Sequence, residues 1–234
     1  MDIKEEEILG DQADRHWYYR TKARALRAML PDPFNRRVID VGAGSGFFSR
    51  HLARHGLIDE AWCIDIGYER DRDERVGDAT LRFRKTPQAA DAGLALFMDV
   101  LEHVPDDAAL LAAYRPLLPP TARVIITVPA FQFLWSGHDV YLEHYRRYTL
   151  RMLRDTVARA GYRLVRSHYL YGLILPAAIA TRLLSPTRMT PRSAVRKHGR
   201  LTNAILGAAC AVELPAMRFN KLAGLTVVAI CTPG

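Results

Sequence analysis

Short apolar segments recur along residues 37–128, and polar segments with helical patterns separate them. The apolar segments are rich in β-branched residues along nearly their whole length, which is typical of strands in a parallel sheet covered by helices on both faces. The pattern therefore predicts a doubly wound α/β domain. The predicted strands of this part are Arg37–Val41, Ala61–Ile66, Leu81–Thr86, Ala92–Met98 and Arg123–Val128.

Two of the intervening helices have recognisable ends. The helix over Phe47–His55 precedes Gly56, which is placed to end it in a left-handed cap. Asp106 and Asp107 stand at the start of Ala108–Leu118, where carboxylates favour the positive end of a helix. These signals support the alternation of strands and helices.

The C-terminal part continues the sheet after a long interruption. A helix over Leu150–Ala160 and a strand over Tyr162–Tyr169 are followed, much later, by a last strand over Gly224–Cys231. The sheet is thus predicted to have seven strands and to be mostly parallel. We expect a helical segment at 1–36, one α/β domain formed by 37–171 and 219–234, and a helical insertion at 172–218.

The insertion contains two mostly apolar segments, 172–185 and 201–217, joined by a basic segment. Pro176 and Arg182 interrupt the first, and the second is interrupted by Asn203, Glu213 and Pro215. Neither therefore has the length of uninterrupted apolar sequence that spans a membrane. We expect cap helices that pack on the core, on a partner such as a second copy of the chain, or on a membrane surface.

Charge is distributed unevenly along the chain. The net charge is +8, but residues 146–221 contain fifteen Arg and Lys residues against only Asp155 and Glu213, which leaves −5 for the rest. Such a basic region can meet nucleic acid, anionic lipid or an anionic substrate. The three cysteines have no metal-ligand spacing, and the acidic N-terminus lacks the features of a signal peptide. A cytoplasmic protein is expected, with association with the inner face of the membrane left open.

The most informative motif is Val38-Ile-Asp-Val-Gly-Ala-Gly-Ser-Gly46, in which a strand runs into a glycine-rich turn before a helix. Glycine lets the backbone turn tightly and approach a ligand, and ligands of such sheets bind at the carboxyl ends of the strands. A dinucleotide fingerprint would need its third glycine at position 47, which is Phe47. A different nucleotide-like cofactor is therefore indicated.

Three segments in order resemble class I S-adenosylmethionine (SAM) dependent methyltransferases. They are the glycine motif with Asp40 before it, Asp65 at the end of the second strand, and Asp99-Val-Leu-Glu-His-Val104 after the fourth. The last resembles the signature of methyltransferases that act on small molecules. The resemblance covers about residues 14–170 and the last strand, implies a Rossmann-like fold with SAM as cofactor, and leaves 172–218 uncovered.

The resemblance also implies roles for individual residues. Asp40 would orient the amino-acid end of the cofactor, the glycine turn would line its face, and Asp65 would bind the ribose, with Ile66 beside it. No acid facing the adenine is assigned, because Asp78 precedes the third strand. The expected cofactor contacts in these segments are Asp40, Gly42, Gly44, Gly46, Asp65, Ile66, Asp99, Val100, Leu101 and His103.

The N-terminal segment His16–Arg20 is dense in aromatic and cationic side chains. In methyltransferases of this kind such a segment often folds over the cofactor, so Tyr18, Tyr19 and Arg20 are candidates for the sulfonium and carboxylate contacts. The alternative is an amphipathic helix with Trp17 and Tyr18 on the sheet and Arg20 in solvent. Tyr19 and Arg20 are included among the expected cofactor contacts.

The segment Pro129–Tyr148 follows the fifth strand and should face the transferred methyl group. Methyl transfer needs alignment above all, and a base only where the acceptor must lose a proton. His138 and His144 are the candidate bases, with Asp139 as an orienting partner, and a structural role in the loop is the alternative for each. No metal-ligand spacing is present, and we expect no metal.

These features predict a SAM-dependent methyltransferase with a small, hydrophobic or lipid-like acceptor, O-methylation being slightly favoured. One alternative is a nucleic-acid methyltransferase, which the basic third of the chain suggests. The Asp99 segment argues against it, because base-amine methyltransferases have Asn/Asp-Pro-Pro-aromatic there, and the negative remainder of the chain would repel phosphates. The other alternative is a non-enzymatic membrane- or partner-binding module on a degenerate cofactor fold.

Overall fold

A computed structural model describes residues 10–87, 91–184, 189–191, 193 and 199–234 of the chain. Its strands are β1 (Arg37–Val41), β2 (Glu60–Ile64), β3 (Arg72–Val76), β4 (Ala79–Arg84), β5 (Leu94–Met98), β6 (Arg123–Pro129), β7 (Tyr162–Leu170) and β8 (Thr226–Pro233). Its α-helices are α2 (Trp17–Met29), α3 (Phe47–Arg54), α4 (Asp107–Tyr114), α5 (Gly137–Tyr141), α6 (Leu150–Arg159), α7 (Leu175–Leu183) and α8 (Arg200–Glu213). Short 3-10 helices are η1 (Gly10–Arg15), η2 (Leu101–His103), η3 (Arg115–Leu117), η4 (Gln132–Leu134) and η5 (Leu214–Phe219).

All the strands belong to one sheet, in the order β3-β4-β2-β1-β5-β6-β8-β7. The five strands from β4 to β6 in this order are parallel, whereas β3, β8 and β7 add antiparallel pairs at the two sides. The seven predicted strands are confirmed, and β3 is an eighth. It was missed because Arg72-Asp-Glu-Arg is charged and largely exposed, as suits an edge strand. Asp78 lies in the turn between β3 and β4, ahead of β4 as predicted.

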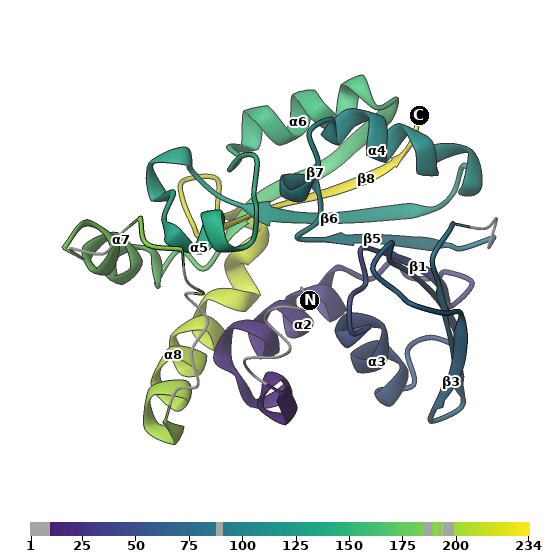
Figure 1. The fold of residues 1–234 in the computed structure, drawn as a ribbon, viewed down its shortest axis with the longest axis horizontal. Helices are drawn as coiled ribbons and strands as arrows, with labels where there is room; N and C mark the ends of the chain where they lie inside the picture. The colour runs from purple at the N-terminus through teal and green to yellow at the C-terminus, as the bar shows by residue number, and fades with distance from the viewer. Residues whose placement is uncertain (1–9, 88–90, 185–188, 192, 194–198) are drawn as a thin grey trace.

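Helices cover both faces of the sheet (Figure 1). Successive strand residues enter opposite cores: Val38 packs in the cluster on the side of α2 and α3, and Ile39 packs in the cluster on the side of α4 and α6. Strands buried on both faces must be apolar throughout, which is why these strands could be predicted from the sequence pattern.

Local signals at the helix ends act as the sequence predicts. The Asp106 carboxylate accepts a hydrogen bond from the backbone N–H of Ala109 at 2.9 Å and caps α4. Gly56 has φ +62° just after α3, in the left-handed region that ends helices. These caps fix where the connections leave the sheet.

The chain between β7 and β8 forms a helical cap at one end of the sheet, where α8 lies beside α2 and α7 lies at the far left of the view (Figure 1). The backbone N–H of Trp17, at the start of α2, donates to Asn203 Oδ1 of α8 at 3.0 Å. The Glu213 carboxylate accepts from the backbone of Gly172 at 2.8 Å and ties α8 to the end of β7. Among the described residues, no helix combines the length and apolar character that crossing a membrane needs.

Candidate functional site

The glycine turn after β1 is held in a conformation that suits glycine. Gly42, Gly44 and Gly46 have φ of +61°, +52° and +74°, and the turn closes with a 2.8 Å hydrogen bond from Gly46 N–H to the Ala43 carbonyl. Side chains rarely adopt this left-handed region. The turn therefore presents bare backbone at the carboxyl end of β1.

Close packing also requires glycine at two of these positions. A Cβ on Gly42 would lie 2.7 Å from Cγ2 of Val100, and one on Gly46 would lie 2.9 Å from the ring of Phe83. The first contact brings the turn against the segment after β5. Two of the motifs found in the sequence thus meet in space.

Asp65 follows β2 and faces the glycine turn. Its carboxylate accepts hydrogen bonds from the backbone N–H groups of Gly44 and Gly67, both at 2.9 Å. The next side chain, Ile66, is 85% exposed, which is unusual for isoleucine. A carboxylate and a free apolar surface therefore stand side by side next to bare backbone, an arrangement that fits a ribose and an adjoining aromatic base.

Asp40 lies deeper, beneath the turn. It is buried, and the Ser49 hydroxyl of α3 donates to its carboxylate at 2.7 Å. Burial raises the pKa of the Asp40 carboxyl. Asp40 thus connects β1 to α3 and supports the turn from below.

Asp99 is held in an unusual position after β5. Its φ is +58°, and its carboxylate accepts from the Thr127 hydroxyl at 3.0 Å and forms an ion pair with the buried Lys22 ammonium. Burial acts to raise the pKa of Asp99, but the Lys22 charge outweighs it and the pKa is lowered. Lys22 also donates to the Tyr18 hydroxyl at 2.6 Å. Sequence reasoning missed Lys22, which reads as one more cation on an amphipathic helix.

The aromatic segment at the start of α2 lies against the same region. Tyr19 is buried with its ring 5.4 Å from that of Phe47, which begins α3, and Tyr18 stacks on Tyr171 with ring centres 5.0 Å apart. Arg20 is exposed. This placement agrees with the amphipathic-helix alternative for Arg20, and the cation that points inward is Lys22.

A cavity of about 420 Å³ lies beyond the carboxyl ends of β5 and β6. One side of it is formed by residues near the cofactor motifs and the other by apolar residues of the cap. His138 and His144 face it from the segment after β6. The lining residues on the first side include Trp17, Tyr18, Tyr19, Asp99, Glu102 and His103, and those of the cap include Ile174, Ala177, Ala178, Thr181 and Leu206.

Asp139 organises the segment between β6 and α6. It is fully buried, and its carboxylate accepts from the Ser136 backbone at 2.9 Å and from two nitrogens of Arg147 at 2.7 and 3.0 Å. The same carboxylate lies 3.0 Å from Nδ1 of His144. Burial acts to raise the pKa of Asp139, but His144 and Arg147 lower it overall. Asp139 is thus an anion that fixes the ring of His144.

The two candidate bases differ in their surroundings. Nε2 of His144 is buried and has no hydrogen-bond partner within the part of the chain that the structure describes. With Nδ1 held by Asp139, this atom is left to accept a proton. Burial lowers the pKa of His138 to about 3, so His138 stays neutral and is a weak base near neutral pH.

Glu102, in the middle of the Asp99–Val104 signature, is a site residue that the sequence did not single out. It is 1% exposed, and its Oε2 has no hydrogen-bond partner among the described residues. Burial, followed by the nearby Asp99 charge, raises the pKa of Glu102 well above its usual range. Ligand atoms of Glu102, His103 and His144 lie within 4.8 Å of one another, close enough for a metal ion to bridge. The expectation of no metal therefore stays a prediction.

Comparison with known proteins decides the family. A family model described as a methyltransferase domain matches residues 14–167, which is more than half of the chain. The chain belongs to this family. Its members are class I SAM-dependent methyltransferases, so SAM is the cofactor.

Two curated relatives of this methyltransferase-family chain have names that state a small-molecule substrate or pathway. The ubiquinone biosynthesis O-methyltransferase of Acinetobacter baylyi is 29% identical over 104 residues, which are 39% of this chain and 43% of the relative. The trans-aconitate 2-methyltransferase of Mycobacterium ulcerans is 28% identical over 160 residues, 65% of this chain and 59% of the relative. The chain thus spans about half the length of the curated relatives it matches.

A solved structure shows that the fold is shared over nearly the whole chain. The methyltransferase in a complex with the Trm112 methyltransferase activator of Haloferax volcanii superposes with a TM-score of 0.59 at 19% identity, covering 95% of this chain and 92% of that one. At this identity the likeness describes the fold alone.

Proposed function

We propose that this protein transfers the methyl group of SAM to a hydroxyl on a small, apolar or lipid-like acceptor. The observation that carries the proposal is the cavity, because it joins residues of the cofactor motifs to apolar residues of the cap. An acceptor held there would lie between the methyl donor and the histidines after β6. The O-methyltransferase among the relatives supports the choice of a hydroxyl.

The residues that we propose to hold SAM come from four segments. Bare backbone at Gly42, Gly44 and Gly46 lets the cofactor approach, the Asp65 carboxylate would accept from the ribose hydroxyls, and Ile66 would cover the adenine. Lys22 is an addition to the residues expected from sequence, since its ammonium is a suitable partner for the cofactor's carboxylate at the cost of its bond to Asp99. Val100, Leu101 and His103 would complete the wall.

SAM supplies a methyl carbon already activated by its sulfonium, so the main work of the protein is to align the acceptor and exclude water. We assign the removal of the hydroxyl proton to Nε2 of His144, with Asp139 holding the ring in the tautomer whose Nε2 is free to accept. Asp139 acts through His144 and is a positioning residue. His138 lines the cavity as a neutral side chain.

Glu102 has a complementary part. Burial raises the pKa of Glu102 and so favours its protonated form, and a protonated carboxyl can donate a hydrogen bond to an acceptor oxygen in the cavity. A donor and an acceptor of hydrogen bonds would then face the same end of the substrate. This pairing favours acceptors that carry two neighbouring oxygens, such as a phenol with an adjacent hydroxyl or methoxy group.

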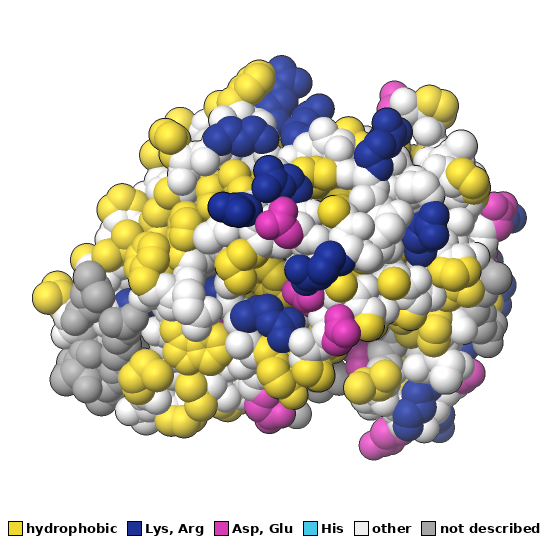
Figure 2. Space-filling view, turned by 90° about the horizontal axis from the view of Figure 1, so that it is seen from above, with side chains coloured by type: hydrophobic (Ala, Val, Ile, Leu, Met, Phe, Trp, Pro, Cys, Tyr) yellow, Lys and Arg dark blue, Asp and Glu magenta, His cyan; other side chains and the backbone are white. Residues whose placement is uncertain are grey.

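The test is a product assay with methyl-labelled SAM. We expect label in organic-extractable products from phenols with apolar side chains, with mass spectrometry placing the methyl on oxygen. Transfer to RNA or DNA with none to phenols would instead support the nucleic-acid alternative. The contact surface would then be the face of the molecule that carries α4 and α6, where Figure 2 shows Lys and Arg side chains. No transfer to any class, despite SAM binding, would favour a non-enzymatic module.

A further inference from the structure

The outer surface of α8 and η5 is a continuous apolar stripe. Leu201, Ile205, Val212 and Phe219 are 73%, 60%, 74% and 69% exposed. The spacing of four and seven residues keeps Leu201, Ile205 and Val212 on one face of α8, and Phe219 follows at the end of η5. The positions between them on this face are also apolar and exposed, namely Ala204, Ala208, Ala211, Pro215 and Ala216. We call these nine residues the α8 stripe.

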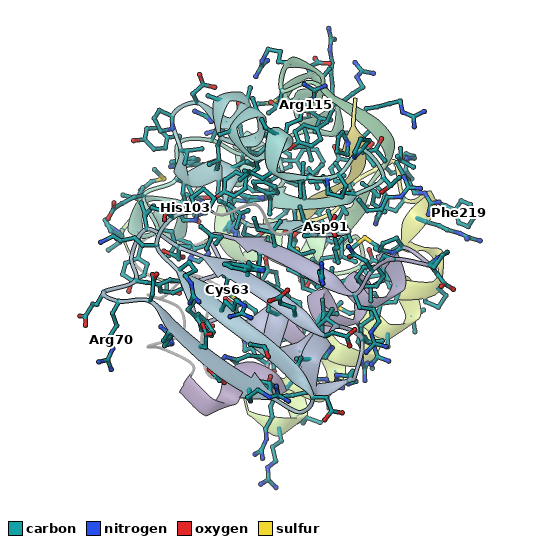
Figure 3. All side chains as sticks on the ribbon, turned by 90° about the vertical axis from the view of Figure 1, so that its right-hand side faces the viewer. Cys63, Arg70, Asp91, His103, Arg115 and Phe219 are labelled. Carbon is teal, nitrogen blue, oxygen red and sulfur yellow. The ribbon has the colours of Figure 1, made fainter. Side chains whose placement is uncertain are left out.

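The opposite side of α8 is already occupied. Leu206 and Ala209 pack against the core cluster beside α2, and Cys210 is buried there. The helix is therefore apolar on both sides, and only one side has a partner among the described residues. In Figure 3 Phe219 projects from the end of η5 at the edge of the molecule.

Charge decides what the α8 stripe fits. Exposed cations stand at its two ends: Arg200 precedes it, Arg218 adjoins its last member Phe219, and Lys221 follows. Glu213, the one acid in 199–223, is turned away, because its carboxylate accepts from the backbone of Gly172 and Leu173. A second copy docked on the same stripe would bring these cations together with no acid to offset them. The surface that complements the α8 stripe is therefore one with an apolar layer under an anionic outer layer.

We propose that the α8 stripe docks the protein on the surface of an anionic lipid bilayer. Its apolar side chains would enter the boundary between headgroups and acyl chains, and the cations at its ends would meet lipid phosphates. The cavity gives this docking a use, since Leu206 lines the cavity from the inner side of the same helix and α7 forms the neighbouring wall. A lipid-like acceptor would have only the thickness of the cap to cross. This last step rests on the proposed function; the docking itself does not.

The experiment is co-sedimentation of the full chain with vesicles of phosphatidylcholine, with and without one third phosphatidylglycerol. We expect binding to the anionic vesicles that weakens with salt. Leu201→Gln/Ile205→Gln/Val212→Gln should reduce it more than tenfold, and Arg200→Gln/Arg218→Gln should reduce it severalfold. Arg151→Gln/Arg154→Gln on exposed α6 removes the same charge from the opposite face and should leave binding within twofold.

Three results would overturn the inference: no binding of the wild type to anionic vesicles, unchanged binding of the triple variant, or a dimer of the wild type that the triple variant abolishes. Circular dichroism and thermal unfolding of each variant separate loss of docking from loss of fold. Calorimetry with SAM on the same samples distinguishes the two proposals, because SAM binding without vesicle binding contradicts only the docking.

Discussion

The two sides of the cavity are built in different ways. On the proposed cofactor side, the Asp99 segment lines the cavity, and the glycine turn and Asp65 lie next to that segment at the ends of adjacent parallel strands. On the proposed acceptor side, the cavity is lined by side chains from helices far apart in sequence, with α5, α7 and α8 all contributing. The position of the cofactor side is fixed by the sheet. The side chains of the acceptor side come from helices outside the sheet, so we expect that they can be replaced without disturbing cofactor binding.

The largest expected effect is on the cofactor side. Gly42→Val should weaken SAM binding by about a hundredfold or more, because the new side chain meets Val100 and the residue must keep a positive φ. Calorimetry measures it. Gly77→Val is the matched control, since Gly77 has φ +60° in the turn between β3 and β4 and its Cβ would meet only the Ala53 carbonyl oxygen, at an ordinary contact distance of 3.8 Å. Equal losses in both variants would point to general strain.

On the acceptor side, His144→Gln should lower kcat by about a hundredfold or more while leaving SAM affinity within twofold, because it removes the proposed base without touching the cofactor segments. His138→Gln should lower kcat less than tenfold, since His138 has a pKa of about 3 and does not take up the proton. Steady-state kinetics with the best phenol found decide between them. The reverse order of effects would transfer the role to His138.

The attachment of the cap to the sheet should be sensitive to acid. The backbone N–H of Tyr169 on β7 donates to the Asn220 carbonyl after η5, beside the fully buried His168. Burial lowers the pKa of His168 to about 4. Below pH 6.5 the unfolded chain takes up a proton that the folded chain refuses until about pH 4, so stability falls as the pH falls.

Chemical denaturation at pH 7.5 and pH 5 measures this effect. His168 should account for about 2 kcal/mol of the loss in unfolding free energy, and His168→Phe should remove that part. A pH dependence that His168→Phe does not alter would contradict the assignment.

A smaller effect should separate acceptor from cofactor binding. Ala178→Phe fills part of the cavity from α7 and should raise the KM for the acceptor about tenfold with SAM affinity unchanged. Ala180→Phe, on the exposed side of the same helix, should leave both unchanged. A change in SAM affinity with Ala178→Phe would show that the two sides are not independent.

Removal of metal ions is expected to have no effect on activity. Dialysis against a chelator should leave activity unchanged, because the reaction proposed here needs only alignment and a base. Elemental analysis of the purified protein checks that no metal remains. Loss of activity that a divalent cation restores would make Glu102, His103 and His144 a metal site and would remove His144 as the base.

The same contrast explains what the sequence could predict. The seven strands, the glycine turn and Asp65 depend on neighbours close in sequence and on the general geometry of parallel sheets, so pattern and spacing located them. Lys22 and Glu102 could not be ranked in this way, because their importance comes from burial beside Asp99. Asp139 was predicted as an orienting partner of the two candidate histidines, but only the structure showed that His144 is the one whose Nδ1 lies against its carboxylate.

The central claim is that the glycine turn and Asp65 hold SAM, and calorimetry with the demethylated product S-adenosylhomocysteine tests it most directly. The wild-type chain should bind one molecule per chain and give no binding heat with NADH. Asp65→Ala should weaken the binding at least tenfold, because the ribose hydroxyls lose their acceptor. Binding of NADH without S-adenosylhomocysteine, or an unchanged affinity in Asp65→Ala, would contradict the account.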